Sequence, residues 1–424
     1  MSALSVSGAV LDGATVGVRC VDGTIEAIGP GVAAQAGDEV IDAAGMPLVP
    51  PLVNGHTHAA MTLFRGYGGD LPLMRWLEEK IWPVEARLEA EDVYWGARLA
   101  CAEMIRSGTA RFWDMYWQPE ATARAVEDAG LRATIGGPLF DADGRTEEMK
   151  AQALADIEAL AEREIGVALA PHSIYAVSEG LLRWAGETAA EHDLAFHIHL
   201  SETEQEVGDC IAAHGERPAF YLDRLGLLGE RTVLAHGVWL EEAELELIAA
   251  RGATVVANPV ANMKLAVGGV MPYPAARRAG VAVGLGTDGA GSNDSLDLLA
   301  DLKLFALSQR HTAGDATVLP AAEALAVASG ARAPLLRGAS PAVAEEGGAL
   351  LAPGAPADFL LLRGDSPELG LGDLAADLVY AASGAVVDTT VIAGRVLMRG
   401  GEVEGMAEIV ARARERAQRL GIGS

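Results

Sequence analysis

The stretch Leu52-Val53-Asn54-Gly55-His56-Thr57-His58 is a short apolar run that ends in two histidines separated by one residue. In an extended strand, side chains two positions apart leave the same face, so both imidazoles can approach one cation. A histidine pair on a strand can equally be a hydrogen-bonded part of the core or the surface. Residues at the ends of later strands decide between these interpretations.

Seven further short apolar segments follow, each ahead of a segment with helical spacing. The eight predicted strands end near Asn54, Asp114, Gly136, Ala170, His199, His236, Asn258 and Gly286. Eight consecutive strand and helix units predict an α/β fold, a (β/α)8 TIM-type barrel, rather than an open doubly wound sheet. No GxGxxG loop follows any of these strands, which supports the barrel.

Two of the intervening helices have clear boundaries in the sequence. From Asp92 to Gly108, apolar residues recur at helical spacing, and Gly108 can end that helix in the left-handed conformation. Ser178 is a good N-cap for a helix that runs to about Glu191.

Both ends of the chain show β-strand patterning instead. Residues 1–50 alternate apolar and polar positions, with a hairpin turn predicted at Asp22-Gly23, and the β pattern returns in residues 341–403. Neither segment has enough apolar surface to be stable alone, so we expect one discontinuous small β-sandwich formed by the two termini. The predicted barrel occupies residues 51–340, and a C-terminal helix residues 404–424.

Composition limits the class of partner. Half of the 424 residues are hydrophobic, and the net charge is −27, from 32 basic and 59 acidic side chains. An excess of acidic groups argues against nucleic acid or an anionic membrane as a partner. No apolar run reaches membrane-spanning length, and the N-terminus lacks signal-peptide features. The sequence leaves a homo-oligomer open.

The three cysteines are Cys20, Cys101 and Cys210, which are widely spaced and form no CxxC motif. An odd number of isolated cysteines is typical of reduced structural thiols. We therefore expect a cytoplasmic protein.

Candidate metal ligands follow the later strands of the predicted barrel. His199 ends the fifth strand with Glu202 three residues on, His236 ends the sixth, and Asp288 follows the eighth. Carboxyl ends of barrel strands meet at one face, where active sites of this fold lie. Histidine nitrogens with one carboxylate and no cysteine are typical of a catalytic, zinc-type site with room for water.

At these residues the chain resembles the amidohydrolase superfamily, and within it the deaminases that act on 5'-methylthioadenosine and S-adenosylhomocysteine. The resemblance covers the barrel almost end to end, and the flanking β segments match that superfamily's composite domain. The matching stretches are Asn54–Thr62, Asp70–Met74, Trp76–Pro83, Ala170–Ser173, His199–Glu204 and Asn258-Pro259.

The resemblance implies that one divalent metal ion is held by His56, His58, His199 and Asp288. Zinc is the expected metal, although the same ligands suit iron and manganese. The implied reaction is hydrolytic: a metal-activated hydroxide attacks C6 of a 5'-modified adenosine, releasing ammonia and the inosine analogue.

Proton transfers in that reaction fall to named residues by the same resemblance. Asp288 takes the proton of the nucleophile, Glu202 protonates the ring nitrogen, and His236 orients the attacking water. His197 shares the inward face with His199 and is predicted to support the ligands or the core rather than to bind metal.

Substrate contacts are implied for Glu85, which would accept hydrogen bonds from the ribose hydroxyls, and for His172. The chain departs from the resembled deaminases at the end of the third strand. They commonly have an arginine that reaches the distal group of the substrate, whereas this chain has Ile135-Gly136-Gly137-Pro138. Arg145 is close enough in sequence to supply a guanidinium instead, and the two glycines predict open space for the 5'-substituent.

Other reactions share these metal motifs. Deamination of guanine, a pterin or aminodeoxyfutalosine, and hydrolysis of a triazine, are alternatives within the superfamily; the Glu85 segment favours a substrate with a ribose. A non-catalytic barrel scaffold is an alternative of another class. It predicts lost ligands, and every implied ligand is present here.

Overall fold

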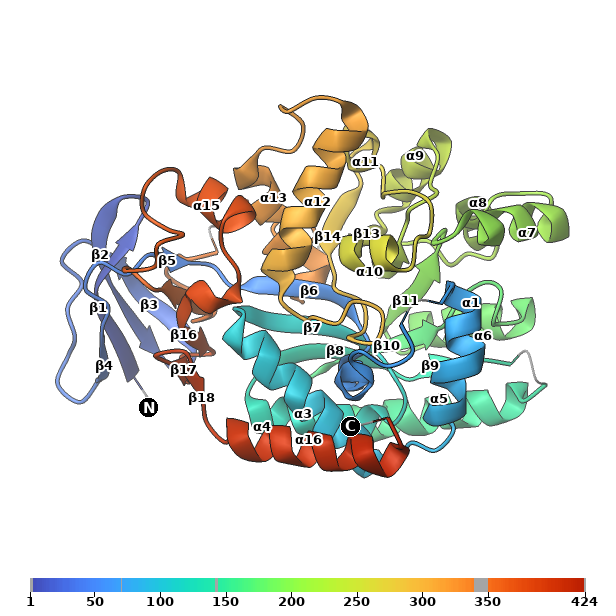
Figure 1. Ribbon diagram of the computed structural model, residues 1–424, viewed down its shortest axis with the longest axis horizontal. Helices are drawn as coiled ribbons and strands as arrows, with labels where there is room; N and C mark the ends of the chain where they lie inside the picture. Colours follow the sequence, from blue (N-terminus) through green and yellow to red (C-terminus); the bar gives the residue numbers. More distant parts are fainter. Residues whose placement is uncertain (1–2, 70, 142–143, 339–349, 423–424) are drawn as a thin grey trace.

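The computed structural model of the protein describes residues 3–69, 71–141, 144–338 and 350–422. Eight parallel strands close into a barrel at its centre (Figure 1). They are β6 (Leu52–Thr57), β7 (Thr109–Met115), β8 (Arg132–Gly136), β10 (Gly166–Pro171), β11 (Ala195–Leu200), β12 (Thr232–His236), β13 (Thr254–Ala257) and β14 (Ala282–Leu285). Pairing of β14 with β6 and of β10 with β11 closes the ring, which confirms the predicted barrel.

The predicted strand ends lie within three residues of the observed ones. The largest difference is at β6, which continues past Asn54 to Thr57 and so carries His56 inside the strand. All six residues of β6 are buried, because one face points into the barrel and the other contacts helices. A short extra strand, β9 (Pro138–Leu139), pairs with the end of β10.

Helices surround the barrel as predicted. They are α3 (Ala90–Arg106), α4 (Pro119–Ala129), α5 (Thr146–Leu160), α6 (Glu179–Glu191), α7 (Glu204–His214), α8 (Pro218–Arg224), α9 (Glu242–Arg251), α10 (Pro259–Lys264), α11 (Tyr273–Ala279), α12 (Leu298–Ala313) and α13 (Ala321–Ala328). Gly108, with φ of +83°, follows the end of α3, and the Ser178 hydroxyl accepts a hydrogen bond from Leu181 N at the start of α6. Both predicted helix boundaries are therefore confirmed.

The shorter helical segments between β6 and α3 lie over one end of the barrel. They are η1 (Ala59–Phe64), α1 (Leu73–Trp76), η2 (Leu77–Ile81) and α2 (Trp82–Glu85). Their apolar side chains form a separate hydrophobic cluster that includes Phe64, Trp76 and Ile81.

The two ends of the chain form the small sandwich that the sequence predicts. One sheet contains β1 (Ala3–Leu11), β2 (Ala14–Val21), β3 (Thr24–Gly29) and β4 (Glu39–Asp42); the other contains β5 (Leu48–Val49), β15 (Phe359–Leu362), β16 (Val387–Ile392), β17 (Arg395–Arg399) and β18 (Glu402–Val403). Val6 and Val18 of the first sheet share a buried core with Phe359 and Leu361 of the second. The ends are also joined through the backbone, because β5 pairs with β15.

The C-terminal helix α16 (Met406–Leu420) runs along α3 on the outside of the barrel (Figure 1). Arg419 forms ion pairs with Asp92 and Glu89, which begin α3. The division into residues 1–50, 51–340, 341–403 and 404–424 stays a prediction, and its boundary at 340/341 lies outside the described residues.

Two further sequence expectations concern cysteine chemistry and membranes. Cys20, Cys101 and Cys210 are all buried free thiols, and burial raises the pKa of Cys101 to about 12. Among the described residues, no helix has the length and apolarity needed to cross a bilayer.

Candidate active site

The strands of the barrel bring four predicted site residues to one point. His56 lies in β6, His199 in β11 and His236 at the end of β12, while Asp288 follows β14. One potential ligand atom from each lies within 4.8 Å of those of the other three, and all four residues are buried. The barrel therefore assembles a metal-binding group from positions 56 to 288 of the chain.

His58 adjoins this group. Its Nε2 lies 3.2 Å from Oδ1 of Asp288, beside His56 Nε2 at 3.3 Å from the same oxygen. The four-residue group contains His236, which the resemblance assigns to the water, rather than His58, which it assigns to the metal. The choice of ligands among the five residues thus stays a prediction.

Hydrogen bonds to Nδ1 orient three of the imidazoles. His58 donates to the carbonyl oxygen of Met115 at 2.6 Å, and His199 donates to that of His172 at 2.6 Å. His236 Nδ1 lies 2.8 Å from Oδ1 of Asn262. A proton on Nδ1 leaves the Nε2 lone pair available, and such a contact is typical of metal-binding histidines.

His56 is held by another histidine. Its Nδ1 lies 3.0 Å from Nε2 of His197, which agrees with the prediction that His197 supports a ligand. Trp113 contacts the other side of His197 edge to face, with ring centroids 5.9 Å apart.

Two buried atoms show that a cation fits here. Among the described residues, His56 Nε2 and Asp288 Oδ1 have no hydrogen-bond partner, although each is shielded from solvent. An imidazole lone pair and a carboxylate oxygen 3.3 Å apart repel one another unless a proton or a metal ion lies between them. Nitrogen and oxygen donors without sulfur suit zinc in a catalytic site.

The protonation states of His56, His199 and Asp288 favour metal binding. Burial lowers the pKa of His56 to about 4 and moves the pKa of His199 well below its usual value, so both are neutral at pH 7. The pKa of Asp288 lies well below its usual value: burial opposes this shift, but contacts with His56 and His58 outweigh burial.

Three residues around the metal group adopt the left-handed backbone conformation without being glycine. They are Ser201, with φ of +51°, His236, with φ of +76°, and Asp288, with φ of +60°. Such conformations are costly for most residues and concentrate at functional sites. Here they turn the chain sharply at the ends of β11, β12 and β14.

Ser292 restrains the Asp288 carboxylate. The hydroxyl of Ser292 donates to Oδ2 of Asp288 at 2.5 Å, which leaves Oδ1 directed at the histidines. The two residues stand four apart in sequence, a spacing that the sequence analysis did not use.

Glu202 lies beside the metal group in the loop after β11. Its side chain is buried, burial raises its pKa, and its Oε1 lies 3.9 Å from Nδ1 of His236. A carboxyl group with a raised pKa is suited to donate a proton near neutral pH.

Glu206, which the sequence analysis did not identify, holds the backbone of this loop. Its carboxylate accepts hydrogen bonds from Ser201 N at 2.8 Å and from Glu202 N at 2.9 Å. Glu206 is itself buried, and burial raises its pKa to about 7. Its position four residues after Glu202, in the first turn of α7, is the signal that could have found it.

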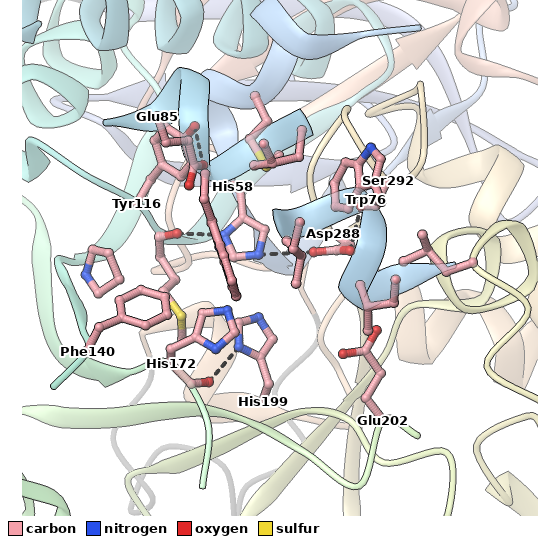
Figure 2. A pocket seen from close by; sticks show the side chains of 18 of the residues that line it. His58, Trp76, Glu85, Tyr116, Phe140, His172, His199, Glu202, Asp288 and Ser292 are labelled. Atoms are coloured by element: carbon pink, nitrogen blue, oxygen red, sulfur yellow. Dashed lines mark hydrogen bonds and ion pairs between the residues drawn. The ribbon is translucent and has the colours of Figure 1, made fainter. Parts of the chain in front are cut away.

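A cavity of about 660 Å³ opens next to the metal group. Its lining includes the predicted residues His58, Glu85, His172, His199, Glu202, His236 and Asp288. Figure 2 shows Glu85 and Tyr116 on one side of His58, with Asp288, Ser292 and Glu202 on the other.

Glu85 is fixed by two aromatic residues. Tyr116 Oη donates to Oε1 at 2.8 Å, and Trp117 Nε1 lies 3.4 Å from Oε2. Its carboxylate lines the cavity, and burial raises its pKa.

His172 follows β10 with its imidazole in the cavity wall. The ring lies between those of Phe140 and His199, with centroids 4.5 and 4.6 Å away, and burial lowers its pKa to about 3. A neutral imidazole in this wall can exchange a hydrogen bond with a ligand.

Arg145 is not among the residues that line the cavity. It immediately precedes α5, its side chain is 48% exposed, and a guanidinium nitrogen lies 3.7 Å from Glu148. The described structure therefore does not bring Arg145 together with the other predicted site residues.

The expected open space at Gly136 and Gly137 is absent, which corrects the sequence analysis. A Cβ on Gly136 would lie 2.7 Å from the carbonyl oxygen of Ala168 and 2.7 Å from Ala170 Cβ, and one on Gly137 would lie 2.6 Å from the Asp156 carboxylate. Gly136 therefore allows close packing of β8 against β10, and Gly137 allows close approach of α5, rather than widening the cavity.

Comparisons with known proteins agree with this architecture. The chain is 48% identical to a 5'-deoxyadenosine deaminase of Methanoregula boonei, over 90% of this chain and 86% of that one. It is 42% identical to a 5-methylthioadenosine/S-adenosylhomocysteine deaminase of Archaeoglobus fulgidus, over 90% of each. A crystal structure of an adenosine deaminase from Xanthomonas campestris with bound zinc superimposes with a TM-score of 0.88 at 34% identity, covering 99% of this chain and 98% of that one.

The amidohydrolase family model matches residues 48–397, which include the whole barrel and most of the second terminal sheet. With this match and relatives above 40% identity over nine-tenths of its length, the chain belongs to the amidohydrolase family.

Proposed function

We infer that this protein is a hydrolytic deaminase of a 5'-modified adenosine, releasing ammonia and the corresponding inosine. The observation that carries this proposal is one cavity with a metal-binding group and Glu202 at one side and Glu85 at the other. Relatives named for deamination of 5'-deoxyadenosine, 5-methylthioadenosine and S-adenosylhomocysteine support the same reaction class.

We assign zinc as the metal, with His56, His58, His199 and Asp288 as its ligands. The zinc reported with the Xanthomonas campestris structure and the nitrogen and oxygen donors of this site support that assignment. Zinc in such a site makes a nucleophilic water available near neutral pH by lowering its pKa to about 7. His236 lies close enough to this group to orient the water by a hydrogen bond.

The carboxyl groups carry the proton transfers. Asp288, whose pKa is low, accepts the proton of the attacking water, and Glu202, whose pKa is raised, protonates a ring nitrogen. Water adds at C6 of the adenine, the C6–N bond breaks, and ammonia leaves with the transferred proton. One water is consumed for each ammonia released, so the reaction needs no oxidant or reductant.

The ribose is assigned to Glu85. A carboxylate has enough lone pairs to accept hydrogen bonds from both hydroxyls of a cis-diol while keeping Tyr116 and Trp117 as donors. His172, in the wall between the two sides of the cavity, is assigned to contact the sugar or the base.

Ammonia release from a panel of substrates tests the proposal. The zinc-loaded protein should deaminate 5'-deoxyadenosine, 5'-methylthioadenosine or adenosine and leave guanine, a pterin, aminodeoxyfutalosine and a triazine unchanged. Activity only on a free base would support the metal chemistry but contradict the role of Glu85 in binding the ribose. A protein that purifies without stoichiometric metal and acts on none of these compounds would be the non-catalytic scaffold.

A further inference from the structure

The wall of the cavity next to Glu85 is aromatic. Trp117, which contacts the Glu85 carboxylate, stacks on Phe140 with ring centroids 5.6 Å apart and planes 19° apart, and Phe140 in turn contacts His172. Pro138 and Trp82 line the same cavity. C5' of a nucleoside is bonded to C4', next to the carbon that bears the 3'-hydroxyl. A ribose held by Glu85 therefore brings its 5'-substituent within reach of this wall.

Apart from the metal group and the imidazoles, the described residues supply the cavity with carboxylates but with no positively charged side chain. Glu85, Glu202 and Asp288 are its carboxylates, and no lysine or arginine is among the lining residues of the described structure. All 32 basic residues of the chain are described, since none of the residues outside the described ranges is lysine or arginine.

Two of the basic side chains near the cavity pair with carboxylates outside it. Arg75, next to the lining residue Trp76, pairs with Glu79, and Lys264, next to the lining residue Leu265, pairs with Asp294. At the end of β8, Gly136 packs too closely against β10 for any side chain to reach the cavity from that position.

We propose that this site selects adenine nucleosides whose 5'-substituent is uncharged and apolar, such as 5'-deoxy or 5'-alkylthio groups, and discriminates against a substituent that bears a carboxylate. This inference rests on the proposed deaminase function. An anion beside Trp117 and Phe140 would lose its hydration without gaining a cationic partner, and it would face the negative charge of Glu85. An apolar group has no strong hydration to lose there, and it gains contact with the aromatic rings.

Two substrates of equal size and different charge test the proposal. They are the 5'-carbamoylmethylthio and 5'-carboxymethylthio derivatives of 5'-deoxyadenosine, in which an amide replaces a carboxylate. We expect kcat/KM for the amide to exceed that for the acid by at least about tenfold, a ratio typical of one unfavourable group in a pocket. Equal values, or a preference for the acid, would overturn the proposal. S-Adenosylhomocysteine, with its carboxylate, should likewise fall below 5'-methylthioadenosine.

A pair of variants tests whether the aromatic wall causes the preference for an uncharged 5'-substituent. Phe140→Arg adds a cation to the aromatic wall and should narrow or reverse the preference for the amide, whereas neutral Phe140→Gln should keep it. An unchanged ratio in a Phe140→Arg protein that still deaminates 5'-deoxyadenosine would contradict the proposal. The proposal would also be contradicted if the wild-type protein turns over the acid and the Arg145→Ala variant does not. Arg145 would then supply the cation.

Calorimetric binding separates this inference from the deaminase function. If none of the nucleosides is turned over, the proposed function fails, and the Kd values of amide and acid for the zinc-loaded protein still measure the charge preference. A lower Kd for the amide than for the acid would support the charge selection even though no reaction occurs. Equal binding, or no binding of either compound, would end both proposals.

Discussion

At the scale of single residues, Glu202 is the group whose removal separates chemistry from binding. Glu202→Gln keeps the size of the side chain but removes the acidic proton, while the candidate metal ligands stay intact. We expect about 10²- to 10⁴-fold lower kcat, the usual contribution of general acid catalysis, with stoichiometric zinc retained. Steady-state ammonia release and elemental analysis measure the two quantities, and normal turnover would refute the role of Glu202 as the acid.

Glu206 should act through the position of Glu202. An amide oxygen in Glu206→Gln can accept one of the two backbone N–H groups, but its NH₂ group cannot accept the other, so the turn at Ser201 and Glu202 loosens. We expect kcat to fall about tenfold or more with KM changed little, as expected for a defect in the reacting geometry.

A double-mutant cycle distinguishes this positioning role from general destabilisation. In the Glu202→Gln background the Glu206→Gln change should cost almost nothing further, because the residue that it positions is already inactive. Glu204→Gln, an exposed residue in the same turn of α7, is the matched control and should leave kcat unchanged. Additive losses in the double variant would refute the positioning role.

The roles of His58 and His236 differ in what their removal costs. If His58 is a ligand and His236 orients the water, His58→Ala should lose most of the zinc, whereas His236→Ala should keep zinc and lose turnover. His199→Ala, which removes a ligand in either assignment, should lose the metal and serves as the reference. Zinc content after dialysis distinguishes the two roles. If His236→Ala loses zinc and His58→Ala retains it, His236 is the ligand and His58 orients the water.

At the scale of secondary structure elements, β8 and β10 depend on a glycine contact. Gly136→Ala would bring Cβ to 2.7 Å from the backbone oxygen of Ala168, so the two strands must separate. We expect a loss of about 1–3 kcal/mol in the free energy of unfolding, as for an overpacked core. Urea denaturation of the zinc-loaded protein measures it.

Gly208→Ala in α7 is the control for this substitution. Apart from the adjacent backbone of α7 and the two neighbours in the chain, no described atom lies within 4 Å of the added Cβ there, and alanine in a helix interior is more stable than glycine by about 0.5–1 kcal/mol. Equal stability of the two alanine variants would mean that the contact between β8 and β10 is not restrictive.

At the scale of the whole molecule, the metal group ties distant parts of the chain together. Its members come from β6, β11 and β12 and from the loop after β14, so a bound ion links strands around the barrel. An ion that binds only the folded state stabilises it according to its concentration relative to Kd. We expect a chelator to lower Tm by about 5 °C or more, with recovery when zinc is returned.

Scanning calorimetry with and without chelator makes this measurement. The His199→Ala protein should show a lower Tm that a chelator no longer changes. A wild-type Tm that is indifferent to chelation would mean that the metal group contributes nothing to the stability of the fold.

Local patterns in the sequence predict the elements and the residue types at their ends. Alternating and helical periodicities are local properties, so eight strands, their helices and the two-part sandwich could be predicted. The spacing of His56 and His58 on one strand, and the positions of His199, His236 and Asp288 after others, identified the candidate metal site for the same reason.

The way these residues are held, and what surrounds them, depends on contacts between distant segments. The contacts of His58 with Met115 and of His236 with Asn262 join residues 57 and 26 positions apart, and they depend on strand register and loop direction rather than on local spacing. The tight packing at Gly136, the exposed position of Arg145 and the aromatic wall beside Glu85 likewise arise from where separate segments meet. Local patterns specify which groups the chain carries, while packing between distant segments determines which of them face the cavity.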